Sequence, residues 1–155
     1  MLEVDVVRIS VIVPIYNVKL YIERCVRSLM EQTLENIEFI FVNDCTPDDS
    51  MDILHYVLEE YPKRREQIKI IEHETNRGIS AVRNTGLKNA TGQYIIYCDS
   101  DDWVEKNMYE KLLVKALETS ADIVGCDFFD DYVAHSTICL LYTSDAADEA
   151  RRVDL

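Results

Sequence analysis

The chain has 155 residues, 48% of them hydrophobic, which suffices for one core and therefore for one domain or part of one. Its formal charge of −13 would repel nucleic acid or an anionic membrane surface, so we expect no nucleic-acid partner. The 5 cysteines form no C-x-x-C pair, which fits neither a disulfide framework nor a zinc site and predicts reduced thiols in the cytoplasm. No apolar run approaches the roughly 20 residues of a membrane span, so we expect no transmembrane segment.

Strand-like and helix-like patterns alternate along most of the chain. Continuous apolar runs predict strands at 9–17, 37–44, 68–73, 91–99 and 121–129. Helical spacing of apolar residues predicts helices at 20–33, 46–61, 78–90 and 106–120. We expect the first strand to end at Pro14 and the third helix to turn Ile79, Val82 and Leu87 inward. This alternation predicts a mostly parallel, Rossmann-like α/β sheet with right-handed crossovers and helices on both faces.

Polar residues follow several of the predicted strands. Tyr16 and Asn17 come after the first strand, Asp44 after the second, and an acidic stretch at 99–102 after the fourth. In open α/β sheets, ligands bind beyond the carboxyl ends of the strands, near the point where strand order reverses. We therefore expect these residues to border a ligand crevice.

The acidic stretch has two interpretations. Adjacent carboxylates repel one another unless a cation neutralises them, and Mg²⁺ or Mn²⁺ is typically held by one or two carboxylates together with substrate phosphates. Asp99 and Asp101, two residues apart, would both face one ion if Ser100 forms a bend. Alternatively, the acids cap a helix that begins near Glu105, as acids at helix starts commonly do.

Four motifs in the same order resemble the nucleotide-sugar-binding part of the family 2 glycosyltransferases, which are inverting enzymes of the GT-A fold. The similarity covers about Ile9 to Phe129 and includes "VPIYN", "VNDCTPD", "NRGISAVRNTG" and "CDSDDW". The resemblance implies a UDP-sugar donor, a divalent cation (Mn²⁺ or Mg²⁺), and transfer of the sugar to a saccharide or lipid-linked acceptor hydroxyl. It also implies a role in bacterial cell-surface polysaccharide synthesis, in the cytoplasm at the inner face of the membrane, with peripheral membrane association of the longer protein.

The resemblance also implies roles for individual residues. Three of them would border the nucleobase, namely Pro14, Tyr16 and Asn17, although strand termination and packing explain Pro14 and Tyr16 equally well. Asp44 would accept a hydrogen bond from a uracil N–H, its alternative being a cap on the following helix, for which Asp48 and Ser50 are better placed.

Arg83 would contact the diphosphate or form a structural salt bridge to an aspartate. Asp99 would lie near the ribose and the metal, and Asp101 would be the metal ligand. Asn43 and Cys45 depart from the commonest family residues, an acid and a glycine, which bears on nucleotide selectivity.

The catalytic base is not identified in this chain. In the family it is an acid well beyond the D-x-D motif, so we expect a truncated GT-A domain that binds the donor and does not turn over alone.

We interpret 1–133 as the nucleotide-sugar-binding fragment. Residues 134–155 contain "CLLYTSDAADE", which resembles a translated sequencing adaptor, and we interpret them as a non-native or disordered tail. His55, His73 and His135 have no constellation around them and are interpreted as solvated or packed side chains.

Three other classes of protein are alternatives. A phospho-acceptor signalling domain would need an acid pair after the first strand, where this chain has "PIYN". A nucleotidyltransferase would need a Gly-rich phosphate loop with a basic residue after the same strand, and the chain has none. A non-catalytic nucleotide-binding or interaction module derived from a glycosyltransferase stays open at this point.

Overall fold

A computed structural model describes residues 8–126 and 142–144 of the chain. They fall into two compact units, divided between Lys106 and Asn107. The first unit alternates strands and helices as the sequence predicts. Its elements are β1 (Ile9–Ile15), α1 (Ile22–Met30), β2 (Ile37–Asn43), α2 (Ser50–Glu59), the 3₁₀ helix η1 (Pro62–Gln67), β3 (Ile68–Glu72), α3 (Ile79–Asn89) and β4 (Tyr94–Tyr97).

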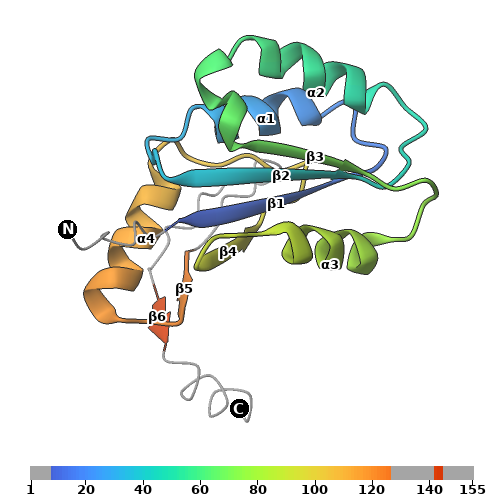
Figure 1. Cartoon of the computed structure of the whole chain (residues 1–155). Helices are drawn as coiled ribbons and strands as arrows, with labels where there is room; N and C mark the ends of the chain where they lie inside the picture. The colour runs from blue at the N-terminus through green and yellow to red at the C-terminus, as the bar shows by residue number, and fades with distance from the viewer. Residues whose placement is uncertain (1–7, 127–141, 145–155) are drawn as a thin grey trace, which may run out of the picture. The chain divides into compact units, whose positions relative to one another are not determined.

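The four strands form one parallel sheet in the order β3-β2-β1-β4. The chain moves outward from β1 to β3 and then crosses back to place β4 on the other side of β1. Because parallel crossovers are right-handed, this reversal puts the connecting helices on opposite faces. Figure 1 shows α1 and α2 on one face of the sheet and α3 on the other. The predicted Rossmann-like sheet with helices on both faces is confirmed.

The core lies around the two central strands. Every residue of β1 is buried, as is every residue of β2 except Asn43, which is the pattern of strands covered on both faces. The helix α1 buries its apolar stripe against this sheet as its spacing predicts, and the buried residues are Ile22, Cys25, Val26, Leu29 and Met30.

The helix α3 packs differently from the prediction. Val82 and Gly86 are its buried residues, whereas Ile79 and Leu87 are 49% and 47% exposed. A Cβ atom on Gly86 would lie 2.3 Å from Ile12 Cγ2, so the helix approaches β1 through a residue without a side chain. The expectation that Ile79 and Leu87 point inward is therefore wrong, because the close contact is made along the Val82–Gly86 line.

Pro14 lies within β1, which continues to Ile15, so the expectation that the strand ends at the proline is also wrong. The Cys98 N–H donates to the Ile12 carbonyl at 3.0 Å, and the next bond of a parallel ladder would require an N–H at position 14. Proline has none, and pairing between β1 and β4 ends at Ile12 and Tyr97. On its other side β1 stays paired with β2 as far as Ile15.

A buried carboxylate lies near the amino ends of the strands. Glu38 of β2, 3% exposed, accepts hydrogen bonds from the Ser10 hydroxyl at 2.5 Å and from both the N–H and the hydroxyl of Thr91, and it pairs with Lys69 at 2.9 Å. Burial opposes ionisation, but these partners prevail and lower the pKa of Glu38 to about 2. The network ties β1, β2, β3 and the loop before β4 together.

The second unit consists of α4 (Met108–Thr119), β5 (Ile123–Gly125) and β6 (Tyr142–Ser144), with β5 and β6 paired antiparallel. The strand predicted at 121–129 is thus shorter than expected and pairs outside the parallel sheet. Apart from Tyr142–Ser144, the interpreted tail at 134–155 lies outside the described residues, as does His135, and the 1–133 boundary stays a prediction. Among the residues that are described, none of the helices combines the length and apolarity that crossing a bilayer requires.

Candidate functional site

The carboxyl ends of the four parallel strands meet at one edge of the sheet. Strand order reverses between β1 and β4, and this is where an open α/β sheet forms its ligand crevice. The structure places Tyr16 and Asn17 directly after β1, Asp44 directly after β2, and Asp99 two residues after the end of β4. The side chain of Tyr16 is 48% exposed, whereas Pro14 is buried within β1.

The loop after β1 is fixed by the loop that precedes α2. Asn17 has the left-handed φ of +56° that asparagine tolerates, and its N–H donates to Thr46 Oγ1 at 2.8 Å. The Lys19 N–H donates to Asp48 Oδ2 at 3.0 Å. The other oxygen of Asp48 accepts bonds from Thr46 and from the N–H and hydroxyl of Ser50, and these donors outweigh burial and lower the pKa of Asp48 to about 2. Asp48 therefore supports both the start of α2 and the chain at 17–19.

Asp44 is 2% exposed and organises a different loop. Its Oδ1 accepts the Arg77 N–H at 2.9 Å, and its Oδ2 accepts the Gly78 N–H at 2.7 Å. Burial opposes ionisation, but these bonds and one from His73 hold the pKa of Asp44 below its usual value. The carboxylate therefore holds the turn into α3, where Gly78 has a φ of +82°, and it does not cap α2.

His73 belongs to this cluster, although the sequence interpretation gave it no role. Its Nδ1 lies 2.7 Å from Asp44 Oδ1, and its Nε2 lies 2.9 Å from Thr85 Oγ1 on α3. The interpretation as a side chain without a constellation is wrong, because the partners are 29 and 12 residues away in the sequence and only the fold brings them together. The sequence contains one signal for this role. His73 directly follows the strand β3, whose end lies next to the end of β2.

Arg83 projects from α3 toward the end of β4. Its Nη2 donates to Asp99 Oδ1 at 2.9 Å, and its guanidinium lies 5.4 Å from the centre of the Tyr97 ring. Both members of the ion pair are about half exposed, so water screens the pair and it contributes little to stability. The structural salt bridge expected as one alternative for Arg83 is thus present, and the predicted contact with a diphosphate stays a prediction.

The acidic stretch forms a turn. The Asp102 N–H donates to the Asp99 carbonyl at 3.0 Å, and Asp101 is exposed beside it. Partial burial and the negative charges of Asp101 and Asp99 raise the pKa of Asp102. The next helix begins at Met108, with Asn107 at its N-cap, so the alternative that these acids cap a helix near Glu105 is wrong.

The main chain beneath the acidic turn is held by two buried thiols. Cys25 of α1 and Cys98 each point Sγ at the Asp99 carbonyl, at 3.8 and 3.7 Å. A hydrogen bond with Cys98, together with burial, raises the pKa of Cys25 well above its usual value. Cys25 is therefore a buried thiol that packs against the start of the D-x-D segment.

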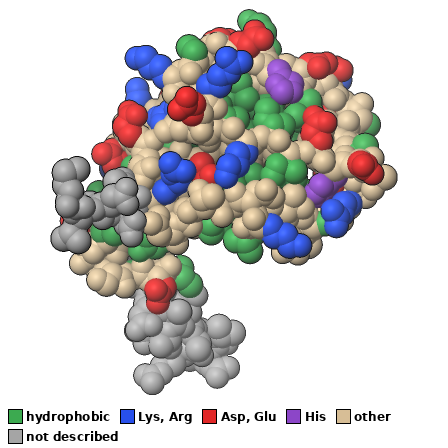
Figure 2. All heavy atoms as spheres, in the orientation of Figure 1, with side chains coloured by type: hydrophobic (Ala, Val, Ile, Leu, Met, Phe, Trp, Pro, Cys, Tyr) green, Lys and Arg blue, Asp and Glu red, His purple; other side chains and the backbone are tan. Residues whose placement is uncertain are grey.

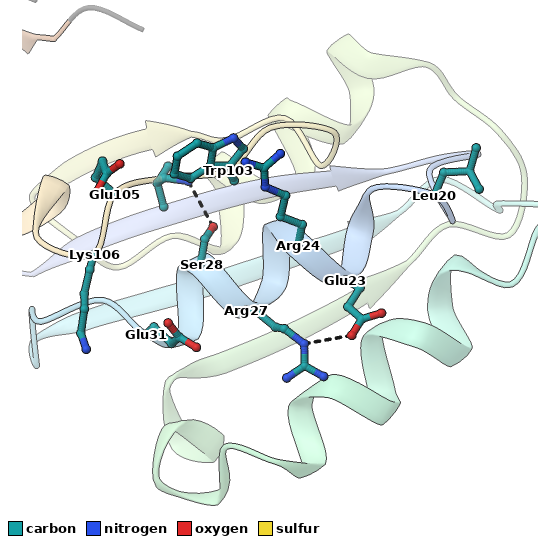
Figure 3. A pocket seen from close by; sticks show the side chains of 10 residues that line it. Leu20, Glu23, Arg24, Arg27, Ser28, Glu31, Trp103, Glu105 and Lys106 are labelled. Atoms are coloured by element: carbon teal, nitrogen blue, oxygen red, sulfur yellow. Dashed lines mark hydrogen bonds and ion pairs between the residues drawn. The ribbon is translucent and has the colours of Figure 1, made fainter. Parts of the chain in front are cut away.

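A groove of about 570 Å³ lies along α1 and the segment 103–106 (Figure 3). Arg24 stacks on the Trp103 ring at 4.4 Å, and the Val104 N–H donates to the Ser28 hydroxyl at 3.1 Å. None of the predicted site residues lines this groove. On the face shown in Figure 2, basic and acidic side chains are interspersed, so the net charge is not gathered into one acidic patch there.

Comparison with known proteins identifies the family. The model of the family described as "Glycosyl transferase family 2" matches residues 10–137. The chain belongs to glycosyl transferase family 2. It is 48% identical over 121 residues to the uncharacterized glycosyltransferase EpsJ of Bacillus subtilis, covering 78% of this chain and 34% of EpsJ. It is 43% identical over 122 residues to the glycosyltransferase GlyA of Streptococcus pneumoniae, covering 79% of this chain and 17% of GlyA.

Solved structures share the fold. TarS of S. aureus, residues 1–349, in complex with UDP-GlcNAc, is 32% identical with a TM-score of 0.66 over 76% of this chain and 33% of that 1–349 fragment. The mannosyltransferase PcManGT of Pyrobaculum calidifontis, in complex with GDP-Man and Mn²⁺, is 25% identical with a TM-score of 0.62 over 72% of this chain and 32% of that protein. The chain spans about a third or less of the length of the proteins that it matches, and the predicted GT-A fold is confirmed.

Proposed function

We propose that this chain is the donor-binding part of a glycosyltransferase that transfers a sugar from a UDP-sugar to an acceptor hydroxyl with inversion. The observation that carries the proposal is the Arg83–Asp99 pair beside the D-x-D turn, at the carboxyl edge of the sheet where strand order reverses. The similarity to TarS in complex with UDP-GlcNAc supports a uridine nucleotide as the donor's leaving group.

The acidic turn fits a hard divalent cation such as Mn²⁺ or Mg²⁺. Asp99 keeps Oδ2 available while its Oδ1 accepts Arg83, and the exposed Asp101 adds a second carboxylate. Within 8–126 and 142–144, no group of three or more ligand residues gathers for a cation. Two carboxylates suit a cation whose remaining ligands are substrate phosphates and water. Asp99 and Asp101 would hold this ion, and it would supply Lewis-acid stabilisation of the leaving diphosphate.

Arg83 would act on the leaving group as a second positive charge. Its guanidinium is permanently charged and already oriented by Asp99 and by the Tyr97 ring. A cation fixed in this way stabilises negative charge that develops on the diphosphate as the bond to the anomeric carbon breaks. The acceptor oxygen would attack from the opposite face after losing its proton to a carboxylate that belongs to the part of the family's proteins beyond this chain.

The nucleobase would lie over the loop after β1. Tyr16 presents a half-exposed ring, and the Asn17 backbone is fixed by Thr46. Pro14 is buried, so its contribution would be to shape the floor of the site. The predicted contact of Asp44 with a uracil N–H stays a prediction, because this carboxylate already accepts three hydrogen bonds within the chain and is 2% exposed.

The acceptor belongs to a cell-surface polysaccharide in this proposal, and the enzyme would act in the cytoplasm at the inner face of the membrane. Donor binding is testable on this chain directly. We expect isothermal titration calorimetry to show UDP binding that strengthens at least about tenfold when Mn²⁺ is added. The Asp101→Ala variant should lose the Mn²⁺-dependent increment, because it removes one of two protein ligands to the ion.

The matched control is Glu66→Ala. Glu66 is an exposed carboxylate on η1, which precedes β3 and is thus near the amino end of that strand. The Glu66→Ala substitution removes the same charge far from the proposed site. It should leave the affinity for UDP, with and without Mn²⁺, within about twofold of that of the parent chain. A folded chain that binds no UDP with or without Mn²⁺ would overturn the donor-site proposal, and equal losses in Asp101→Ala and Glu66→Ala would overturn the assignment of the metal ligand.

A further inference from the structure

His73 connects three elements at the candidate site. It follows β3 directly, its ring contacts Asp44 after β2, and it reaches Thr85 in the middle of α3. Its side chain is 5% exposed and that of Asp44 is 3% exposed, so water does not replace either partner. The 2.7 Å separation between Nδ1 and the carboxylate oxygen is that of a charge-assisted hydrogen bond.

The protonation pattern of the ring follows from its neighbours. Asp44 is ionised at neutral pH, because its pKa is lowered, and an ionised carboxylate is an acceptor alone. Nδ1 must therefore carry a hydrogen. In the neutral ring Nε2 then accepts the hydroxyl hydrogen of Thr85, and both ring nitrogens are satisfied.

Asp44 connects the His73 ring to the backbone of the turn before α3. The oxygen that accepts from His73 also accepts the Arg77 N–H, and the other oxygen accepts the Gly78 N–H. These two amides form the turn into α3, the helix from which Arg83 reaches Asp99. If the imidazole is lost, a buried carboxylate loses one of three donors and becomes free to rotate away from the turn.

We propose that His73 is a positioning residue, which holds the Asp44 carboxylate against the Arg77 and Gly78 amides and thereby fixes the turn that orients α3 toward a nucleoside diphosphate. The effect on the turn is independent of any ligand, whereas the effect on nucleotide affinity rests on the proposed function. His73 acts through Asp44 and the turn, and it does not contact the nucleotide.

The test compares His73→Ala with His73→Asn. The asparagine amide nitrogen occupies about the place of Nδ1 and donates to Asp44, but it does not reach Thr85. We expect amide hydrogen exchange of Arg77 and Gly78, followed by NMR, to accelerate at least about tenfold in His73→Ala and to return to within about threefold of the parent in His73→Asn. The affinity for UDP should fall in His73→Ala and be restored in His73→Asn. The control is His55→Ala, which removes an exposed imidazole on α2.

Two results would overturn the proposal. One is unchanged exchange of Arg77 and Gly78 in His73→Ala, and the other is an asparagine variant that exchanges as fast as the alanine variant. If the parent chain binds no UDP, the proposed function fails and the exchange rates still decide the role of His73. If His73→Ala does not fold, ¹⁵N chemical shifts of the parent decide it, because a ring without a hydrogen on Nδ1 cannot donate to Asp44.

Discussion

At the scale of single residues, Gly86 determines how closely α3 approaches the sheet. A Cβ at this position would lie 2.3 Å from Ile12 Cγ2, 3.1 Å from Cγ1 and 3.2 Å from Cβ of the same residue. Ile12 is fully buried and β-branched, so its side chain has little freedom to move aside. The absence of a side chain at Gly86 therefore allows α3 to pack closely against β1.

We predict that Gly86→Ala destabilises the chain by up to about 2 kcal/mol. Alanine would gain about 1 kcal/mol of helix propensity, but overpacking of a buried contact costs typically 1–3 kcal/mol and we expect it to prevail. Urea denaturation followed by circular dichroism measures the change. Gly125→Ala is the matched control, since a Cβ there meets nothing within 4 Å, and it should alter the free energy of unfolding by less than about 0.5 kcal/mol. A Gly86→Ala variant as stable as the parent would show that α3 shifts freely.

At the scale of elements, one carboxylate connects the loop after β1 to the start of α2. Asp48 accepts the Lys19 N–H with one oxygen and three donors from Thr46 and Ser50 with the other. Its neighbour Asp49 is mostly exposed and has a 3.8 Å ion pair with Lys19. The two adjacent aspartates therefore differ in what their replacement would cost.

Asp48→Asn should destabilise the chain by about 1–2 kcal/mol, because the amide turns a donor toward groups that are donors themselves. Asp49→Asn removes the same charge from a solvated pair and should cost less than about 0.5 kcal/mol. Thermal denaturation of the two variants beside the parent measures the difference. Equal melting temperatures in the two variants would contradict the anchoring role of Asp48.

The elements themselves were largely predictable from local patterns. The four parallel strands and the helices between them follow from continuous apolar runs and helical spacing, both of which are properties of neighbouring residues. The contacts of α3 were not, because the periodicity that pointed to Ile79 and Leu87 carries no information about how near β1 lies. His73 was missed for the same reason, since its partners Asp44 and Thr85 are distant in sequence. The pairing of the short β5 with β6 was not predictable, because an apolar run does not reveal its pairing partner.

At the scale of the whole molecule, carboxylates with lowered pKa values link stability to pH. The pKa of Glu38 falls from a usual value of 4.5 to about 2, that of Asp48 falls to about 2, and that of Asp44 is lowered. In each case the unfolded chain binds protons at a higher pH than the folded chain does. The stabilisation is therefore complete above about pH 5 and is lost as the pH falls toward 2.

Replacing Glu38 should reveal this linkage. We expect Glu38→Gln to lower the free energy of unfolding by about 2–3 kcal/mol at pH 7 and by much less at pH 3, where much of the wild-type contribution is already lost. Urea denaturation at the two pH values measures both differences. Glu35→Gln, at an exposed position two residues before β2, should have little effect at either pH. A loss of equal size at pH 7 and pH 3 would contradict the assignment to an ionised Glu38.

The proline in β1 has a consequence for the shape of the crevice. At position 14 the backbone offers no N–H toward the side where β4 would continue, so the bond that would extend pairing beyond Ile12 cannot form. Pairing between β1 and β4 therefore ends at this point, while β1 and β2 stay paired to Ile15. An absent hydrogen atom thus ends the sheet on the β4 side of β1 two residues before Asp99, so the acidic turn at the edge of the proposed crevice lies outside the strand ladder.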